Sequence, residues 1–411
     1  MIMSIRWCGF SAGASGKWRD SMNRQFEIKA AAGAYARAVR HRRHIHAYPE
    51  LSGREYATAQ HVFKRLLRLG LAPRRYVRGA GVAASLTYGK GPVVVVRADL
   101  DALPIQEENR VPFRSRVPGV MHACGHDVHT AVLLGVAEIL CRWKQRLRGT
   151  VVFLFQPAEE RSPGGARAMI SQGAFPGRVD AVFGLHVNPE YPTGSVAVAS
   201  GCDYAGVSDF DLIVKGRGGH GATPKTAIDP ISCAARIIVR LEALTKGKRS
   251  ELVSIGSVHA GTQYNIIPDT AHIAGTVRAF SSAAMARLIR RIRKISTSTC
   301  RSFGARARLS VIKGYPPLCN NPVLAAHAHR ILSRVLGARN VVRRTRPAMY
   351  AEDFAYYALK APAVFLHLGV RPRGKRTAPG IHTARFLPDE KAMMTGMTAL
   401  ASLVAGMMAD P

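Results

Sequence analysis

The stretch Met121-His-Ala-Cys-Gly-His-Asp-Val-His-Thr130 places a thiol and two imidazoles, those of Cys124, His126 and His129, within six residues. Thiolate and neutral imidazole are the side chains that bind borderline-soft divalent metals. The apolar run from Ala131 to Leu140 has helical character, so the stretch predicts a loop that presents metal ligands at the start of a helix. Taken alone, the same residues would also fit a buried cysteine beside ordinary loop histidines.

The composition is that of a globular protein with an unusual charge. The 411 residues are 47% hydrophobic and 21% charged, enough for a large core and two domains. Lys and Arg outnumber Asp and Glu by 59 to 26, which gives a formal net charge of +33. Such a charge could attract nucleic acid or acidic membranes. The basic residues are spread along the chain, however, and no zinc-finger spacing, RNA-binding aromatic signature or basic zipper occurs. We therefore expect no nucleic-acid partner.

Cysteine usage and the terminal segments suggest a cytoplasmic protein. The seven cysteines are scattered and odd in number, which argues against a disulfide framework and for a reducing compartment. Residues 1–25 are interpreted as a basic N-terminal extension without the apolar core of a signal peptide. No apolar run reaches the length of a membrane-spanning helix, so we expect no membrane association.

Strands and helices alternate from residue 26 to about residue 201, which predicts an α/β domain. The expected strands are strongly apolar, as the central strands of a sheet are. Each runs into polar side chains at its end, and ligands of open α/β sheets bind at such strand ends. Adjacent carboxylates there are costly unless a cation or a proton shares them. The strand exits concerned are Arg97-Ala-Asp-Leu-Asp101, Gln156-Pro-Ala-Glu-Glu160 and Gly184-Leu-His186.

The pattern changes between residues 202 and 313. Alternating strands are expected at 208–215, 254–258, 270–280 and 305–312, helices at 230–244 and 284–299, and a loop at 218–224. Two strand-helix-strand units on one sheet predict a ferredoxin-like insert. Residues 314–411 return to the first domain with a helix at 323–336, a strand at 363–368 and a closing helix at 392–409.

Nine motifs in this order resemble the metal-dependent aminoacylase/carboxypeptidase superfamily, and most closely its branch of hippurate hydrolases and indoleacetyl-amino-acid hydrolases. Together they cover residues 44 to 383. The motifs are His46-Ala-Tyr-Pro-Glu-Leu51, Arg97-Ala-Asp-Leu-Asp-Ala-Leu-Pro104, His122-Ala-Cys-Gly-His-Asp127, Gln156-Pro-Ala-Glu-Glu160, Leu185-His-Val187, Gly218-Gly-His-Gly-Ala222, Asn265-Ile-Ile-Pro-Asp269, Glu352-Asp-Phe-Ala-Tyr356 and His382.

The resemblance implies a mixed-sheet α/β catalytic domain of the aminopeptidase type with an inserted ferredoxin-like lid/dimerisation domain. It implies two divalent metal ions per subunit. The soft thiolate of Cys124 favours zinc, and carboxylate and imidazole ligands would also take manganese, cobalt or nickel. The implied ligands are Cys124, His126, Glu160, His186 and His382. Glu159 would be the general acid/base and Asp101 an orienting carboxylate. His220 would reach the metals of the other subunit of a homodimer.

We therefore expect an enzyme that cleaves the amide bond of small N-acyl amino acids. The free carboxylate of such a substrate needs a cation or amide donors, which Asn265 and Arg278 could supply, although Arg278 fits a solvated strand residue equally well. A dipeptidase or an N-acetyl-diaminopimelate-type deacylase is the alternative within the superfamily. A non-catalytic binding protein on the same scaffold is a third hypothesis, and Glu159 beside a full ligand set argues against it.

Overall fold

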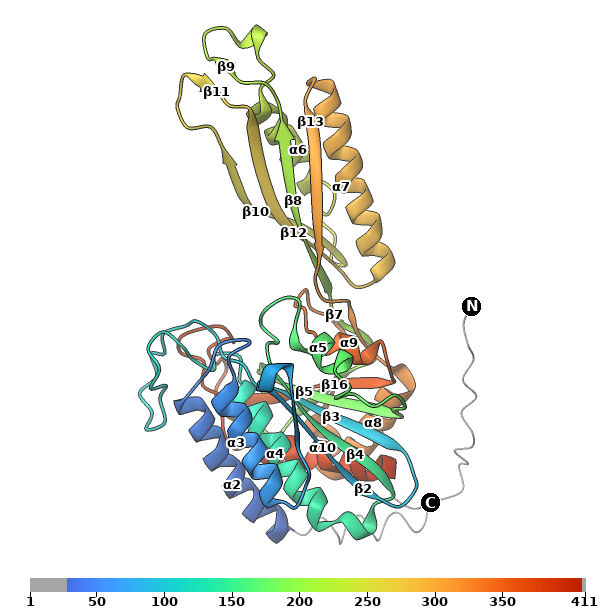
Figure 1. The fold of residues 1–411 in the computed structure, drawn as a ribbon. Coiled ribbons are helices and arrows are strands. Elements are labelled where there is room, and N and C mark those ends of the chain that lie inside the picture. Colours follow the sequence, from blue (N-terminus) through green and yellow to red (C-terminus); the bar gives the residue numbers. More distant parts are fainter. Residues whose placement is uncertain (1–27, 409–411) are drawn as a thin grey trace.

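The computed structural model describes residues 28–408, so the predicted N-terminal extension lies outside the described residues. The chain forms two bodies placed end to end, which give the molecule an elongated shape (Figure 1). We call them the main body, residues 28–204 and 314–408, and the insert, residues 206–313. An eight-stranded sheet forms the centre of the main body, and a four-stranded sheet that of the insert.

The main sheet is mixed. Its strand order is β1-β2-β4-β3-β5-β16-β6-β15, in which β4, β3, β5 and β16 are parallel neighbours. The central strands are buried on both faces, as expected for parallel strands covered by helices. The strands are β1 (Arg74–Tyr76), β2 (Gly81–Tyr88), β3 (Val93–Asp99), β4 (Gly149–Gln156), β5 (Ala181–Pro192), β6 (Val196–Ala199), β15 (Val341–Arg344) and β16 (Ala363–Arg371).

Helices cover both faces of this sheet. On β3, Val94 and Val96 belong to the core under the larger set of helices, and Val95 belongs to the core on the opposite face, as the two-residue period of a strand requires. The larger set is α2 (Ile28–Ala47), α3 (Tyr56–Arg68), α4 (His126–Arg142), α8 (Pro322–Leu336) and α10 (Ala392–Met408), and the opposite face carries α5 (Gly165–Ser171) and α9 (Ala355–Ala358).

The insert has the ferredoxin-like order of elements. Its strands are β8 (Gly206–Lys215), β10 (Glu251–Ala260), β12 (Thr270–Ala279) and β13 (Arg306–Lys313), antiparallel in the order β10-β12-β8-β13. Helices α6 (Pro230–Glu242) and α7 (Ser282–Ser302) pack on the face that carries Phe210, Leu212 and Val214. The short strands β9 (Gly219–His220) and β11 (Ile266–Ile267) pair at the end of the insert that is farthest from the main body (Figure 1).

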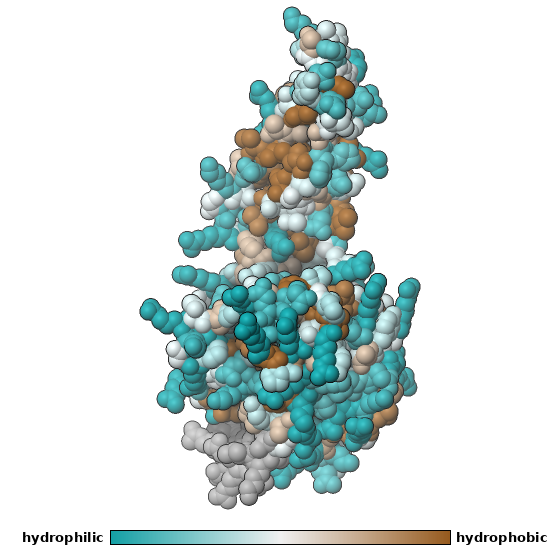
Figure 2. All heavy atoms as spheres, turned by 90° about the vertical axis from the view of Figure 1, so that its left-hand side faces the viewer, coloured by the Kyte–Doolittle hydropathy of each residue, from teal (hydrophilic) through white to brown (hydrophobic). Residues whose placement is uncertain are grey.

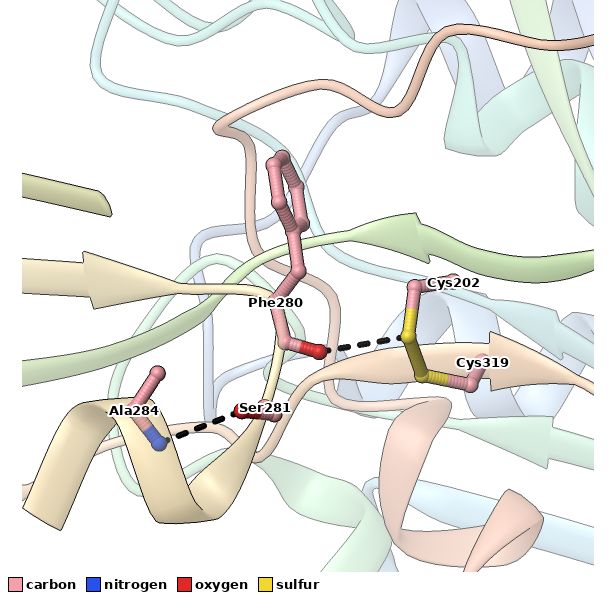
Figure 3. Close-up of a disulfide and its surroundings, with 5 residues drawn as sticks. All are labelled: Cys202, Phe280, Ser281, Ala284 and Cys319. Carbon is pink, nitrogen blue, oxygen red and sulfur yellow. Dashed lines mark hydrogen bonds between the residues drawn. A yellow bond between two sulfur atoms is a disulfide. The ribbon is translucent and has the colours of Figure 1, made fainter. Parts of the chain in front are cut away.

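The junction between the bodies contains one disulfide, which the expectation against a disulfide framework did not foresee. Strands β7 (Gly201–Tyr204) and β14 (Leu318–Asn320) are antiparallel and join Cys202 to Cys319. Figure 3 shows the bond beside the start of α7, with the Cys202 sulfur 3.2 Å from the carbonyl oxygen of Phe280. The two cysteines are 117 residues apart in sequence and only the pairing of these strands brings them together, which no local pattern reveals.

The expected fold class is confirmed: an α/β main body with a mixed sheet and a ferredoxin-like insert. Two local predictions were wrong. The expected loop at 218–224 contains β9, and β5 continues to Pro192 instead of ending near residue 183, because it pairs with β16 past His186. The domain limits at 201/202 and 313/314 stay a proposal. No helix of the described residues is long and apolar enough to cross a membrane.

Candidate metal centre

The cluster of candidate ligands lies where the parallel strands of the main sheet end. β3 ends at Asp99, and α4 begins at His126 after Gly125. Gly125 has a φ of 86°, and a Cβ there would lie 2.5 Å from a methyl carbon of Val187. Only glycine satisfies both constraints, so this residue allows the loop before α4 to pass close to β5.

Sulfur, nitrogen and oxygen atoms of the five predicted ligands converge in this cluster. The sulfur of Cys124 lies 3.3 Å from Nε2 of His186 and 3.3 Å from Nε2 of His382. Oε1 of Glu160 lies 3.1 Å from Nε2 of His382 and 3.9 Å from Nε2 of His126. Distances of this size suit donors that share metal ions, because each metal–ligand bond is only about 2.0–2.3 Å long.

Carboxylate and carbonyl oxygens orient the imidazoles. Asp101 lies 3.1 Å from Nδ1 of His126, and it also accepts hydrogen bonds from the Ser52 hydroxyl and the Glu160 amide. Nδ1 of His186 lies 2.7 Å from the carbonyl oxygen of Val187. Both contacts leave Nε2 available for the cluster, and partners of this kind fix the ring of a metal-binding histidine.

His129 differs from the other two residues of the initial motif. Its Nδ1 lies 2.6 Å from Asp99, and its Nε2 accepts a hydrogen bond from the amide of Val187. Both ring nitrogens are therefore occupied by the protein. Asp99 and His129 thus brace the strand ends beside the cluster, and Cys124 and His126 remain as the donors that the motif contributes.

Two buried atoms of the cluster, Nε2 of His126 and Oε1 of Glu160, make no hydrogen bond of acceptable geometry within the described residues, although Oε1 lies 3.1 Å from Nε2 of His382. A buried polar atom without a partner costs free energy unless another group satisfies it. Because these atoms belong to residues whose neighbours are a thiol, imidazoles and carboxylates, the donor set fits a divalent metal. His382 supports the same interpretation, since it holds a strained φ of 60° beside the cluster.

The electrostatics of the site also favour a cation. Burial, followed by the nearby Glu160 and Glu159, raises the pKa of the Cys124 thiol well above its usual value. Burial acts against protonation of His126, but Asp99, Asp101 and Glu160 together raise its pKa to about 10. The surroundings of the cluster therefore favour positive charge, and a bound divalent cation would supply that charge and would let the thiol coordinate as a thiolate.

Glu159 occupies a different environment from its neighbour Glu160. Its side chain is buried, and burial together with Glu352, Glu160 and Asp353 raises its pKa well above the usual value. The hydroxyl of Tyr315 donates to its carbonyl oxygen at 2.5 Å, which fixes the backbone. A carboxylate with a raised pKa in a dry site is suited to accept and return a proton.

The buried guanidinium of Arg97 holds the carboxylates behind Glu159, and sequence reasoning gave it no role. Arg97 contacts Asp99 at 2.7 Å, Asp353 at 2.8 Å and Glu352 at 3.0 Å, and donates to Gln156 at 2.9 Å. A charged residue directly after four valines could have signalled this, because a buried arginine must be paired. Two of these partners, Glu352 and Asp353, are more than 250 positions away in the chain, however.

The structure places two predicted site residues, His220 and Asn265, far from the cluster of their own chain, and a third, Arg278, where the insert meets the main body. His220 is exposed on β9, where its Nδ1 accepts a hydrogen bond from the Ala222 amide. Asn265 is exposed beside it, and its carbonyl oxygen accepts from the Gly221 amide. Both lie at the far end of the insert (Figure 1). Arg278 lies at the near end of β12, is half-buried, and donates to the carbonyl oxygen of Met349 at 2.7 Å, so it is not a fully solvated strand residue.

Comparison with known proteins agrees with this fold and site. The family model described as Peptidase family M20/M25/M40 matches residues 95–406. The chain is 38% identical to thermostable carboxypeptidase 1 of Saccharolobus solfataricus, over 88% of this chain and 93% of that protein. It is 35% identical to the IAA-amino acid hydrolase ILR1-like 4 of Arabidopsis thaliana, over 88% of this chain and 83% of that protein.

A solved structure extends the comparison. The Bacillus subtilis YXEP protein, described as a dinuclear metal binding peptidase from the M20 family, has a TM-score of 0.80 and 33% identity, over 91% of this chain and 98% of that one. Fold and donor set define a metal-dependent amidohydrolase or peptidase. The chain belongs to the peptidase family M20/M25/M40, and the resemblance found in the sequence is confirmed.

Proposed function

We propose that this enzyme binds two divalent metal ions and hydrolyses the amide bond of N-acyl amino acids. The observation that carries the proposal is the convergence of Cys124, His126, Glu160, His186 and His382 beside the buried carboxyl group of Glu159. The name of the Arabidopsis relative describes a substrate of this kind, and YXEP is described as dinuclear. The name of the Saccharolobus relative supports a peptidase activity as the alternative.

In this mechanism the residues of the chain bind, orient and move a proton. Two bound divalent ions supply a water of lowered pKa and polarise the scissile carbonyl. Glu159 accepts the proton of the attacking water and delivers it to the leaving nitrogen. Asp101 keeps Nε2 of His126 directed at the cluster, and a positioned hydrogen-bond donor stabilises the oxyanion. Zinc suits the thiolate and imidazoles best, and manganese, cobalt or nickel would also suit the nitrogen and oxygen ligands.

We propose further that His220 supplies this donor from the insert of a second subunit, and that Asn265 and Arg278 bind the substrate carboxylate. His220 lies at the end of the insert that is farthest from the main body of its own subunit, and this position supports an action on the metal centre of a second subunit. Figure 2 shows hydrophobic surface gathered on the insert. Exposed Ile231 and Val239 on α6 and Val258 on the edge strand β10 offer apolar area for pairing with a second copy.

A cytoplasmic location stays a proposal, and the Cys202–Cys319 disulfide weighs against it because disulfides are rare in reducing compartments. Fractionation of the cells that make the protein tests it directly. Recovery with periplasmic or secreted proteins would contradict a cytoplasmic location.

The function is tested with metal-stripped protein reloaded separately with zinc, manganese, cobalt and nickel. Each form is assayed on N-acetyl, N-benzoyl and indoleacetyl amino acids, and on dipeptides as the alternative class. We expect at least one N-acyl series to be cleaved faster than the dipeptides, and only after a metal is added. Faster cleavage of dipeptides would favour the peptidase, and metal binding without hydrolysis would favour the binding protein.

A further inference from the structure

A second cluster of charged side chains lies on the outside of the main body, on α2, α3 and α4. Its residues line a surface pocket of about 400 Å³, which we call the arginine pocket: Arg37, Arg65, Arg68, Leu69, Glu138, Cys141 and Arg142. Glu138 and Arg142 follow His126 by three and more turns along α4, a distance of about 18–24 Å at 1.5 Å per residue. The arginine pocket is therefore separate from the candidate metal centre.

One buried carboxylate organises the guanidinium groups. Glu138, whose side chain is only 4% exposed, accepts hydrogen bonds from Arg37 at 2.9 Å, from Arg142 at 2.8 Å and from Arg65 at 2.5 Å. Burial acts to raise its pKa, but the hydrogen bond from Arg37 and the charges of Arg65 and Arg142 hold that pKa below the usual value. Glu138 is thus ionised, and it orders three guanidinium groups around one point.

The arginine pocket retains positive charge after this pairing. Four guanidinium groups face one carboxylate and the carboxyl-terminal ends of α3 and α4. Each helix end contributes about half a negative charge, so about two positive charges are left. The arginines in the last turns of α3 and α4, namely Arg65, Arg68 and Arg142, therefore carry more positive charge than is needed to neutralise the two helix ends.

Donors of the arginine pocket are also left over. Nε of Arg65 is buried and has no hydrogen-bond partner among the described residues. Arg68 is exposed and, within residues 28–408, makes no hydrogen bond or ion pair. The side chain of Arg142 is 49% exposed and uses one nitrogen for Glu138. Guanidinium donors in a fixed arrangement match the oxygens of phosphate.

We propose that the arginine pocket binds the phosphate group of a small phosphate monoester. A dianion matches the two positive charges that remain, and its oxygens match the free donors of Arg65, Arg68 and Arg142. The volume exceeds that of a phosphate group and is in the range of small-molecule pockets. Leu69 and Cys141, which also line the arginine pocket, therefore offer apolar surface for the organic part of the ligand.

The proposal is tested by calorimetric titration of the metal-loaded protein with inorganic phosphate and, separately, with glycerol phosphate as a monoester. We expect both to bind at low salt, the monoester more tightly. The double variant Arg68→Gln/Arg142→Gln should weaken both by about tenfold or more, which is the size of one lost charge-assisted hydrogen bond. Arg68→Gln alone, which breaks no contact in the described residues, should weaken binding in the same direction.

The matched control is Arg290→Gln/Arg291→Gln, which removes the same charge from the exposed face of α7 in the insert. It should leave affinity within about twofold of wild type. Equal losses in both double variants would mean non-specific attraction to a basic protein and would overturn the proposal. Unchanged affinity in the arginine-pocket variants, combined with competitive inhibition of hydrolysis by phosphate, would place the anion at the metal centre and would also overturn it.

Discussion

The main body and the insert differ in what they bury. Around the main sheet, buried ionisable side chains form paired groups, among them Arg42 with Asp127 and Arg97 with Asp99. In the insert, which is described throughout, Glu251 is the one buried carboxylate or base. Its core of apolar side chains from β8, β12, α6 and α7 is otherwise that of a stable scaffold. Buried charges are costly unless paired or used, so their concentration in one body marks where the chemistry takes place.

The two bodies also differ in whether their predicted site residues are exposed or buried. The insert presents His220 and Asn265 to solvent at its far end, and the main body encloses Glu159 and most of the candidate ligands. Each body thus holds a part of the proposed active site that is incomplete alone. The insert therefore contributes exposed side chains that can reach a second subunit, whereas the main body contributes a buried setting that shifts the pKa values of its side chains.

The largest expected effect comes from the buried carboxyl group of Glu159. Glu159→Gln should lower hydrolysis by about a thousandfold or more while both metals stay bound, because an amide cannot accept the proton of water. Glu251→Gln is the matched control, since it removes the buried carboxylate of the insert and should leave turnover near wild type. Elemental analysis and initial rates measure both. A similar loss of turnover in the two variants would contradict the conclusion that catalysis depends on the buried carboxyl groups of the main body and not on that of the insert.

The second prediction joins the two bodies across subunits. His220→Ala and Glu159→Ala should each be inactive alone. When the two variants are dissociated, mixed in equal amounts and reassociated, half of the dimers are mixed and each carries one complete site. Activity should then return to about a quarter of wild type. If mixed dimers form, as a pull-down with different tags would show, and remain inactive, His220 does not act in trans.

The third prediction concerns the junction. Reduction of Cys202–Cys319, or the double variant Cys202→Ala/Cys319→Ala, should lower the free energy of unfolding by about 3 kcal/mol, because the bond closes a long loop of the unfolded chain. Cys233 and Cys300 in the insert lie 3.6 Å apart as free thiols, so Cys233→Ala serves as the control and should lose as much stability on reduction as the wild type does, whereas Cys202→Ala/Cys319→Ala should be insensitive to reductant. Urea unfolding with and without reductant measures the difference, and equal curves would argue against a formed disulfide.

The smallest expected effect is a pH dependence of the main body. Burial, followed by the charges of Arg65 and Arg40, lowers the pKa of His41 to about 4, and burial with His41 and His44 lowers that of His61 to about 3. Both are neutral in the folded state and protonate near pH 6.5 when unfolded. Their contribution to stability is therefore present above pH 6.5 and is lost as the pH falls towards 4.

Stability should drop between pH 7 and pH 5 by about 1 kcal/mol per histidine, roughly half of what the full pKa shifts imply, because both rings are partly exposed to solvent screening. The double variant His41→Gln/His61→Gln should flatten this slope. Hydrogen exchange separates the bodies: amides of β3 should lose protection at pH 5, and amides of β12, beside the exposed His259 and His272, should not after correction for intrinsic rates. An equal loss in both strands would contradict the comparison.

Much of the main body could be predicted from the sequence because its signals are local. Apolar strands followed by polar residues predicted β3 and β4 and the positions of Asp99 and Glu160, and the motif before α4 predicted Cys124 and His126 as neighbours. The ferredoxin-like insert followed from its alternating strands and two amphipathic helices.

What could not be predicted depends on contacts distant in sequence. Arg97 finds Asp353 across the fold, and Cys202 meets Cys319 only once β7 and β14 pair. The extension of β5 past His186 depends on pairing with β16. The arginine pocket is assembled from three helices, none of which carries a recognisable anion-binding motif.

The most direct test of the account is the metal content of the purified protein, measured together with its activity. Wild-type protein should hold two divalent ions per chain, lose hydrolysis of N-acyl amino acids on stripping, and recover it on reloading. Cys124→Ser should lose metal and activity together, whereas Cys141→Ser should keep both. Full metal occupancy and activity in Cys124→Ser, or undiminished hydrolysis by the stripped protein, would contradict the assignment of the metal centre.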